Sequence, residues 1–102
     1  MLKIALFGCG RIGQMHAENI FNHKNFKLHY VFDKDKVLAL GLKKKFKCIP
    51  ISDYKIALKD DSIDIIFIAS STSTHIKFIE ESIKYKKIVF CEKPLDLNIS
   101  KV

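Results

Sequence analysis

The sequence predicts an α/β fold in which residues 1–102 form one domain built on a doubly wound parallel sheet. Two observations lead to this prediction. Segments typical of strands and of helices alternate along the whole chain, which favours parallel strands joined by crossover helices. A glycine-rich turn, Gly8-Cys9-Gly10-Arg11-Ile12-Gly13, also stands between the first apolar run and the first amphipathic segment. Right-handed crossovers with one reversal of direction then predict the strand order 3-2-1-4-5.

The first strand and helix flank the glycine turn. Residues 2–7 are apolar except for Lys3, as expected for a strand that is covered on both faces of the sheet. A helix is predicted from residue 12 to about residue 23. Its apolar positions are expected to face the sheet, namely Ile12, Met15 and Ile20.

A second strand and helix follow with the same alternation. Residues 27–32 are expected to form the strand, and residues 35–45 the helix, with apolar side chains at Leu38, Leu42 and Phe46. A short third strand over residues 47–49 is expected to stop at Pro50. Ser52 or Asp53 then caps a short helix. Three of its residues are expected to face inward, namely Tyr54, Ala57 and Leu58.

The second half of the chain contains the most apolar segment. Residues 63–69 are predicted to form a central strand, and the polar residues 70–73 lead into a helix over residues 74–85. Residues 87–91 form a fifth strand, and a last helix is expected to begin near Asn98. The helix over residues 74–85 is expected to turn one apolar stripe inward: Ile76, Ile79 and Ile83.

The glycine turn predicts a dinucleotide site, because its position between strand and helix gives each glycine a separate role. Gly8 permits the tight turn, Gly10 lets the backbone approach a pyrophosphate, and Gly13 lets the helix pack on the strand. The following helix directs its free amide groups and the positive end of its dipole at the phosphates. We therefore assign Arg11 and Ile12 to the cofactor-binding residues together with the three glycines.

Asp33 ends the second strand, twenty residues after Gly13. A carboxylate at this place accepts hydrogen bonds from the adenosine ribose hydroxyls and repels a 2′-phosphate, which favours NAD over NADP. An ordinary aspartate that opens a turn is the alternative. Lys34 and Lys36 weaken the preference, since a nearby cation can accept the additional phosphate, so NADP stays possible.

Two further segments follow strands at the same edge of the sheet. Ser70-Ser71-Thr72-Ser73 comes after the fourth strand, where the strand order reverses and ligands bind. Its hydroxyls can contact the dinucleotide, while Ser73 or Thr74 can equally be a plain helix cap. His75 is included as a cofactor-binding candidate, although a histidine near a helix start is more often structural than catalytic. Glu92-Lys93-Pro94 follows the fifth strand, where Lys93 is either a positioned catalytic cation or part of an exposed turn.

Composition restricts the class of protein. The chain has a formal net charge of +7, but all of its 18 basic residues except Arg11 are lysines, and nucleic-acid recognition usually uses arginine. We therefore expect a solvated basic face and no nucleic-acid partner. No apolar span reaches membrane length and no secretory signal is visible, so we expect no membrane association. The three cysteines lack metal-ligand spacing and indicate reduced thiols in a cytoplasmic protein, with no metal site.

These motifs together resemble the Gfo/Idh/MocA oxidoreductases, and within them the inositol 2-dehydrogenase type. The resemblance runs in matching order over the whole chain, from the glycine turn through His16-Ala17, Asn19, Asp33 and His75 to Cys91-Glu92-Lys93-Pro94-Leu95. It implies that Lys93 contacts the cofactor ribose and a substrate hydroxyl, and that Glu92 and Pro94 shape its loop. It also implies that Ser71, Thr72 and Ser73 correspond to a loop beside the cofactor.

The resemblance has departures as well. Thr72 stands where the family usually has proline, and Lys86 where it usually has glycine before the fifth strand. Family enzymes are also several times longer, with a second domain that supplies the substrate pocket and the proton acceptor. We therefore expect a Rossmann domain that binds NAD(P) and belongs to an enzyme acting on a polyol or sugar-like alcohol, as a homo-oligomer at full length.

Two other functions stay open at this point. A module that senses a dinucleotide without turnover would carry the same glycine turn and Asp33. A basic nucleic-acid-binding domain would instead show salt-dependent retention on DNA and no dinucleotide binding.

Overall fold

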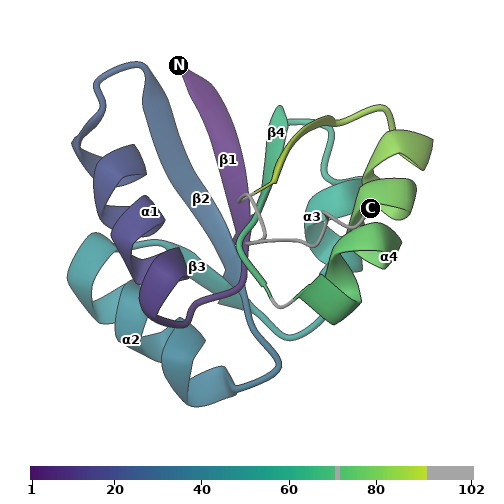
Figure 1. The fold of residues 1–102 in the computed structure, drawn as a ribbon. Coiled ribbons are helices and arrows are strands. Elements are labelled where there is room, and N and C mark those ends of the chain that lie inside the picture. The colour runs from purple at the N-terminus through teal and green to yellow at the C-terminus, as the bar shows by residue number, and fades with distance from the viewer. Residues whose placement is uncertain (71, 92–102) are drawn as a thin grey trace, which may run out of the picture.

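The computed structural model describes residues 1–70 and 72–91, and these form one parallel sheet with helices on both of its faces (Figure 1). The sheet has the order β3-β2-β1-β4-β5, which confirms the predicted doubly wound topology. The strands are β1 (Leu2–Phe7), β2 (Phe26–Phe32), β3 (Ile49–Ile51), β4 (Ile65–Ile68) and β5 (Ile88–Cys91). The helices are α1 (Arg11–Asn22), α2 (Lys36–Phe46), α3 (Lys55–Lys59) and α4 (Thr72–Lys84).

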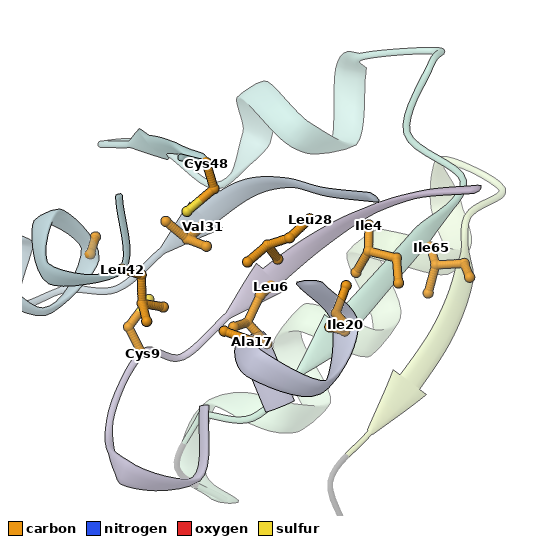
Figure 2. Packing of buried hydrophobic residues seen from close by; sticks show 11 residues of the cluster. Ile4, Leu6, Cys9, Ala17, Ile20, Leu28, Val31, Leu42, Cys48 and Ile65 are labelled. Atoms are coloured by element: carbon orange, nitrogen blue, oxygen red, sulfur yellow. The ribbon is translucent and has the colours of Figure 1, made fainter. Parts of the chain in front are cut away.

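The hydrophobic core lies in two layers, because successive side chains of a strand point to opposite faces of the sheet. Ile4 and Leu6 of β1 face α1 and α2, where they join Ala17 and Leu42 (Figure 2). The intervening side chains of β1 face α3 and α4 and pack there with Ile66, Ile68, Leu58 and Phe78. The strand at the centre of the sheet is therefore covered on both sides, as its apolar sequence predicts.

Two helices bury the faces expected from the sequence. In α2, Leu42 is fully buried and Leu38 and Phe46 pack against the same core. In α3, Ala57 and Leu58 are buried beside the partly buried Tyr54.

The inward face of α1 differs from the prediction. Ile20 is buried as predicted, but Ile12 and Met15 are 42% and 49% exposed, and Gly13 and Ala17 are buried in their place. The start of α1 lies against the glycine turn itself, since a side chain on Gly13 would collide with the carbonyl oxygen of Gly8. Small residues are therefore needed where the sequence pattern suggested large ones.

The predicted inward stripe of α4 is also wrong at two of its three positions. Ile76 and Ile83 are 68% and 61% exposed, and Phe78 and Ser82 are buried in their place, with Ile79 partly buried. Phe78 takes the inward position because its ring packs edge-on against other aromatic rings. Its ring centroid lies 5.0 Å from those of Phe7 and Tyr54 and 6.3 Å from that of Phe32.

Strand β3 runs through Pro50 instead of stopping before it. Pro50 pairs with Val31 of β2, and no strand among the described residues lies on the other side of β3. Proline is tolerated on an edge strand, because its missing amide hydrogen need not complete a ladder on the open side. The helix expected near Asn98 lies outside the described residues.

The link from α4 to β5 shows the effect of one departure from the family pattern. Lys86 stands where glycine is usual, and its φ of 62° is in the left-handed region that favours glycine. Its amide donates to the carbonyl of Ile83 at 2.8 Å, and the amide of Lys87 donates to that of Ser82 at 3.0 Å. The turn that glycine would favour is thus formed by a lysine. Beyond it, Ile88 and Phe90 of β5 stay more than half exposed.

The contact between α1 and the glycine turn gives a stability prediction. We expect Gly13→Ala to lower the free energy of unfolding by about 1–3 kcal/mol, because the added methyl must displace the backbone of Gly8. Gly41→Ala is the matched control: it lies in α2, and apart from its chain neighbours and its own helix backbone no atom lies within 4 Å of the added carbon. There we expect a gain of about 0.5–1 kcal/mol from helix propensity. Urea unfolding followed by circular dichroism measures the free energy of unfolding of both variants. An equal rise in this free energy for Gly13→Ala and Gly41→Ala would contradict the close contact at Gly13.

Candidate functional site

A cavity of about 430 Å³ lies at the carboxyl ends of the central strands, beside the glycine turn. This edge of the sheet is where the chain reverses its direction of strand addition, and ligands of open α/β sheets bind there. The cavity combines backbone of the turn with aromatic and charged side chains. Its lining residues are Gly8, Gly10, Phe32, Asp33, Lys34, Tyr54, Ala69, Ser70, Lys77 and Phe78.

Gly8 holds the turn against the end of β4. Its φ is +108°, and a side-chain carbon on it would lie 2.5 Å from the backbone carbon of Ala69. Its amide donates to the carbonyl of Phe32 at 2.8 Å, and the amide of Ala69 donates to the carbonyl of Phe7 at 2.7 Å. The ends of three neighbouring strands are thereby tied together at one side of the cavity.

Gly10 has the opposite surroundings. It is the N-cap residue of α1, and a side-chain carbon there would meet nothing within 4 Å. No side chain among the described residues caps this helix end, and its first turn contains no acidic residue. The unbonded amides of a helix start and the positive end of its dipole attract an anion. The space at Gly10 therefore suits a phosphate group that approaches the backbone directly.

Asp33 is held beside the turn by two backbone hydrogen bonds. The amide of Cys9 donates to its Oδ2 at 2.7 Å, and the amide of Asp35 donates to its Oδ1 at 2.8 Å. The helix cap is a different residue, since Asp35 itself accepts a hydrogen bond from the amide of Val37 at 3.0 Å. The carboxylate of Asp33 is therefore fixed in orientation while it lines the cavity, as an acceptor for ribose hydroxyls would be.

Cys9 lies inside the glycine motif, but its thiol is buried away from the cavity. Its Sγ donates to the carbonyl of Phe32 at 3.5 Å. Burial, followed by the negative charge of Asp33, raises the pKa of Cys9 to about 12. Burial also raises the pKa of Cys48. Cys9 is therefore a neutral thiol at ordinary pH and supplies no nucleophile to the cavity.

The structure brings together part of the predicted site. Gly8, Gly10, Asp33 and Ser70 all line the cavity, and so does Lys34, whereas Lys36 does not. Arg11 and Ile12 open α1 as exposed residues outside the lining, and Gly13 is buried beneath the turn. The backbone of Thr72, Ser73 and His75 forms the start of α4. Ser71, Glu92, Lys93 and Pro94 lie outside the described residues.

Sequence reasoning missed four of the residues that line the cavity. Phe32, Tyr54, Lys77 and Phe78 form this part of the lining, from β2, the start of α3, and α4. Tyr54 was expected only as a core residue. Lys77 lies soon after the polar run that follows β4, so a search one turn into that helix would have found it.

Two further properties concern the residues that the structure describes, 1–70 and 72–91. No cluster of histidine, cysteine, aspartate or glutamate there has an arrangement that can hold a metal ion. No helix in those ranges is both long enough and apolar enough to cross a membrane.

Known proteins are similar to this chain in sequence and in fold. Residues 2–102 match the Gfo/Idh/MocA group, an oxidoreductase family with an NAD-binding Rossmann fold. The chain is 35% identical over 107 residues to a myo-inositol 2-dehydrogenase of Thermotoga maritima, with 99% of this chain and 30% of that protein covered. A myo-inositol dehydrogenase from Corynebacterium glutamicum has a crystal structure that matches with a TM-score of 0.87 at 36% identity, over 98% of this chain and 30% of that one.

A third relative was crystallised with its cofactor. GenD2 from gentamicin A biosynthesis, in complex with NAD, matches with a TM-score of 0.88 at 29% identity, over 94% of this chain and 28% of that chain. The chain thus spans about 30% of the length of the relatives it matches. Since the family match covers nearly every residue and the sheet has the expected order, this chain belongs to the Gfo/Idh/MocA oxidoreductases, as their NAD-binding Rossmann domain.

Proposed function

We propose that the cavity binds NAD(H) and that the chain is the cofactor-binding part of a dehydrogenase. One observation carries the proposal: the open space at Gly10 and the uncapped start of α1 lie beside a carboxylate, Asp33, that the backbone holds in place. A pyrophosphate needs the first two features and an adenosine ribose needs the third. The residues present therefore fit a dinucleotide.

The proposal assigns a part of the cofactor to each group of residues. Gly8, Gly10 and Gly13, with Arg11 and Ile12 at the start of α1, hold the pyrophosphate. Asp33 accepts hydrogen bonds from the adenosine ribose and disfavours a 2′-phosphate, so NAD is preferred over NADP. The segment from Ser70 to Ser73, with His75, borders the dinucleotide on the side of β4.

The proposed reaction is hydride transfer between the nicotinamide and a polyol or sugar-like alcohol, as the names of the inositol dehydrogenase relatives suggest. NAD supplies the hydride acceptor when it is bound. Lys93, between Glu92 and Pro94, is proposed to orient a substrate hydroxyl beside the nicotinamide ribose. The proton acceptor is proposed to belong to a second domain, in a protein that acts as a homo-oligomer. The exposed Ile88 and Phe90 of β5 favour association.

A second candidate is a module that binds the dinucleotide without turnover. The same cavity supports it, because Gly8, Gly10 and Asp33 line the cavity while the thiol of Cys9 is buried. Both candidates predict cofactor binding, and they differ in whether a hydride is transferred.

We expect Gly10→Val to abolish the binding of NADH. The space that the new side chain fills is the approach path of the pyrophosphate, and Gly10 has an ordinary φ of −74°, so the fold itself tolerates the change. Calorimetric titration with NADH measures the loss. Gly41→Val is the matched control, since it too enters open space, but on α2 and outside the cavity. Equal affinity of Gly10→Val and Gly41→Val would refute the pyrophosphate site.

The preference for NAD should depend on Asp33. We expect Asp33→Ser to narrow or invert the preference for NADH over NADPH. The difference between the two binding free energies should change by about 1–3 kcal/mol, the scale of one charge-assisted hydrogen bond. Titrations of the wild-type chain and of Asp33→Ser with NADH and with NADPH supply the dissociation constants. Lys34→Ala is the control on the opposite charge, because Lys34 lines the same cavity. A wild-type preference for NADPH would show that a lysine dominates over Asp33.

Turnover separates the dehydrogenase from the sensing module. We expect the 102-residue chain to bind NAD and to form no NADH from inositol or related polyols, because one lysine does not make a closed pocket with a proton acceptor. A protein extended to the full reading frame should turn over and should lose turnover with Lys93→Ala. Absorbance of NADH measures both. Robust turnover by the 102-residue chain would contradict the two-domain proposal.

A further inference from the structure

Another cavity, of about 320 Å³, lies at the edge of the sheet opposite the glycine turn. It is found where β1 and β2 begin and where α1 and α2 end, at the edge that carries the N-terminus in Figure 1. We call this cavity the amino-edge groove. Its lining includes Phe21, Phe26, Lys27, Leu28, Phe46 and Lys47.

Three phenylalanines form the apolar surface of the amino-edge groove. Phe21 lies in the last turn of α1 and Phe46 is the last residue of α2, and their ring centroids are 5.1 Å apart. Phe26 and Phe46 pack against the buried core, which holds both rings in place from beneath. Phe21 is nevertheless 49% exposed. A fixed aromatic surface that stays open to solvent is typical of a contact site for a partner.

Lysines surround this apolar surface. Lys27 and Lys47 line the groove, and no acidic side chain among the described residues does. Lys47 has a left-handed φ of 56°, and its amide donates to the carbonyl of Lys43 at 2.9 Å, so the backbone that carries its side chain is fixed. The last turn of α2 adds three lysines, and the loop before β2 adds the exposed Lys24. The one acidic residue of α1, Glu18, does not line the groove.

The combination of a hollow apolar surface with a cationic rim determines the kind of partner. A bulky apolar side chain fits the hollow, and carboxylates next to it would meet the lysines. A second copy of this chain is disfavoured, because the net charge is +7 and two cationic rims would face each other. A lipid surface is disfavoured as well, because it is entered by apolar side chains that project from a protein, whereas these rings line a cavity.

We propose that the amino-edge groove binds a short acidic segment of another protein. One aromatic or leucine side chain of that segment enters the groove against Phe21 and Phe46, and carboxylates on either side of it pair with Lys27 and Lys47. The cavity beside the glycine turn shares no described lining residue with the groove and lies at the other edge of the sheet. The partner therefore binds without covering the proposed dinucleotide site.

The test begins with peptides selected from a random display library on the immobilised chain. The selected peptides should share an aromatic residue or leucine flanked by glutamate or aspartate. Fluorescence polarisation then measures their dissociation constants for the wild-type chain and its variants. We expect Phe21→Ser to weaken the peptides about tenfold or more, because it removes one wall of the groove. Ile83→Ser is the matched control, since Ile83 is exposed on α4 outside the groove and its loss should change nothing.

The lysines are tested with the same peptides. Lys27→Gln and Lys47→Gln should each weaken binding about two- to fivefold, the scale of an exposed ion pair, and the difference from the wild-type chain should shrink in high salt. Lys84→Gln is the matched control, an exposed lysine of α4 that does not line the groove. Thermal unfolding shows whether Phe21→Ser stays folded, and the two exposed lysines keep the test valid if it does not.

Three outcomes would overturn the proposal. The first is a selection that yields no peptides, or only peptides without acidic residues. The second is equal affinity of the wild-type chain, Phe21→Ser and the two lysine variants for the selected peptides, which would place their binding elsewhere on the chain. The third is retention on phosphatidylserine vesicles that Phe21→Ser abolishes, which would assign the groove to a lipid surface.

Discussion

The close contact between the glycine turn and the end of β4 is the constraint on which both the sheet and the cavity depend. Gly8 leaves no room for a side chain against the backbone of Ala69, and Gly13 leaves none against the carbonyl of Gly8. These two contacts let α1 begin directly where the ends of β1, β2 and β4 meet. As a consequence, the amides at the start of α1 lie beside the carboxylate of Asp33, which follows β2, and residues that follow β4.

Features that depend on neighbours in the sequence were predicted well. The strand order follows from the alternation of apolar runs with amphipathic segments, and the glycine turn follows from its own residues. Asp33 was also placed correctly beside the turn, since the distance along the chain from the turn to the end of β2 is set by one helix and one strand. The roles of these residues toward a cofactor stay predictions.

Features that depend on distant partners could not be predicted in this way. Helix α4 has two apolar faces, and its sequence alone does not distinguish Ile76 and Ile83 from Phe78. The choice is made by aromatic rings that come from β1, β2 and the start of α3. Tyr54 and Lys77 could not be predicted as neighbours in the cavity for the same reason, since they are far apart in the sequence. They approach each other only because α3 and α4 pack on the same face of the sheet.

The protonation state of Cys9 affects the charge beside the cavity, although Cys9 is buried and does not line it. Asp33 is the one carboxylate among the described lining residues, and Lys34 and Lys77 are the cations. A thiolate at Cys9 would add a second negative charge next to Asp33, close to the place proposed for the pyrophosphate. Burial and the charge of Asp33 raise the pKa of Cys9 from 9.0 to about 12, so the thiol stays neutral even at alkaline pH. A buried cysteine inside the glycine motif is therefore compatible with an anionic ligand, whereas an ionised one would oppose it.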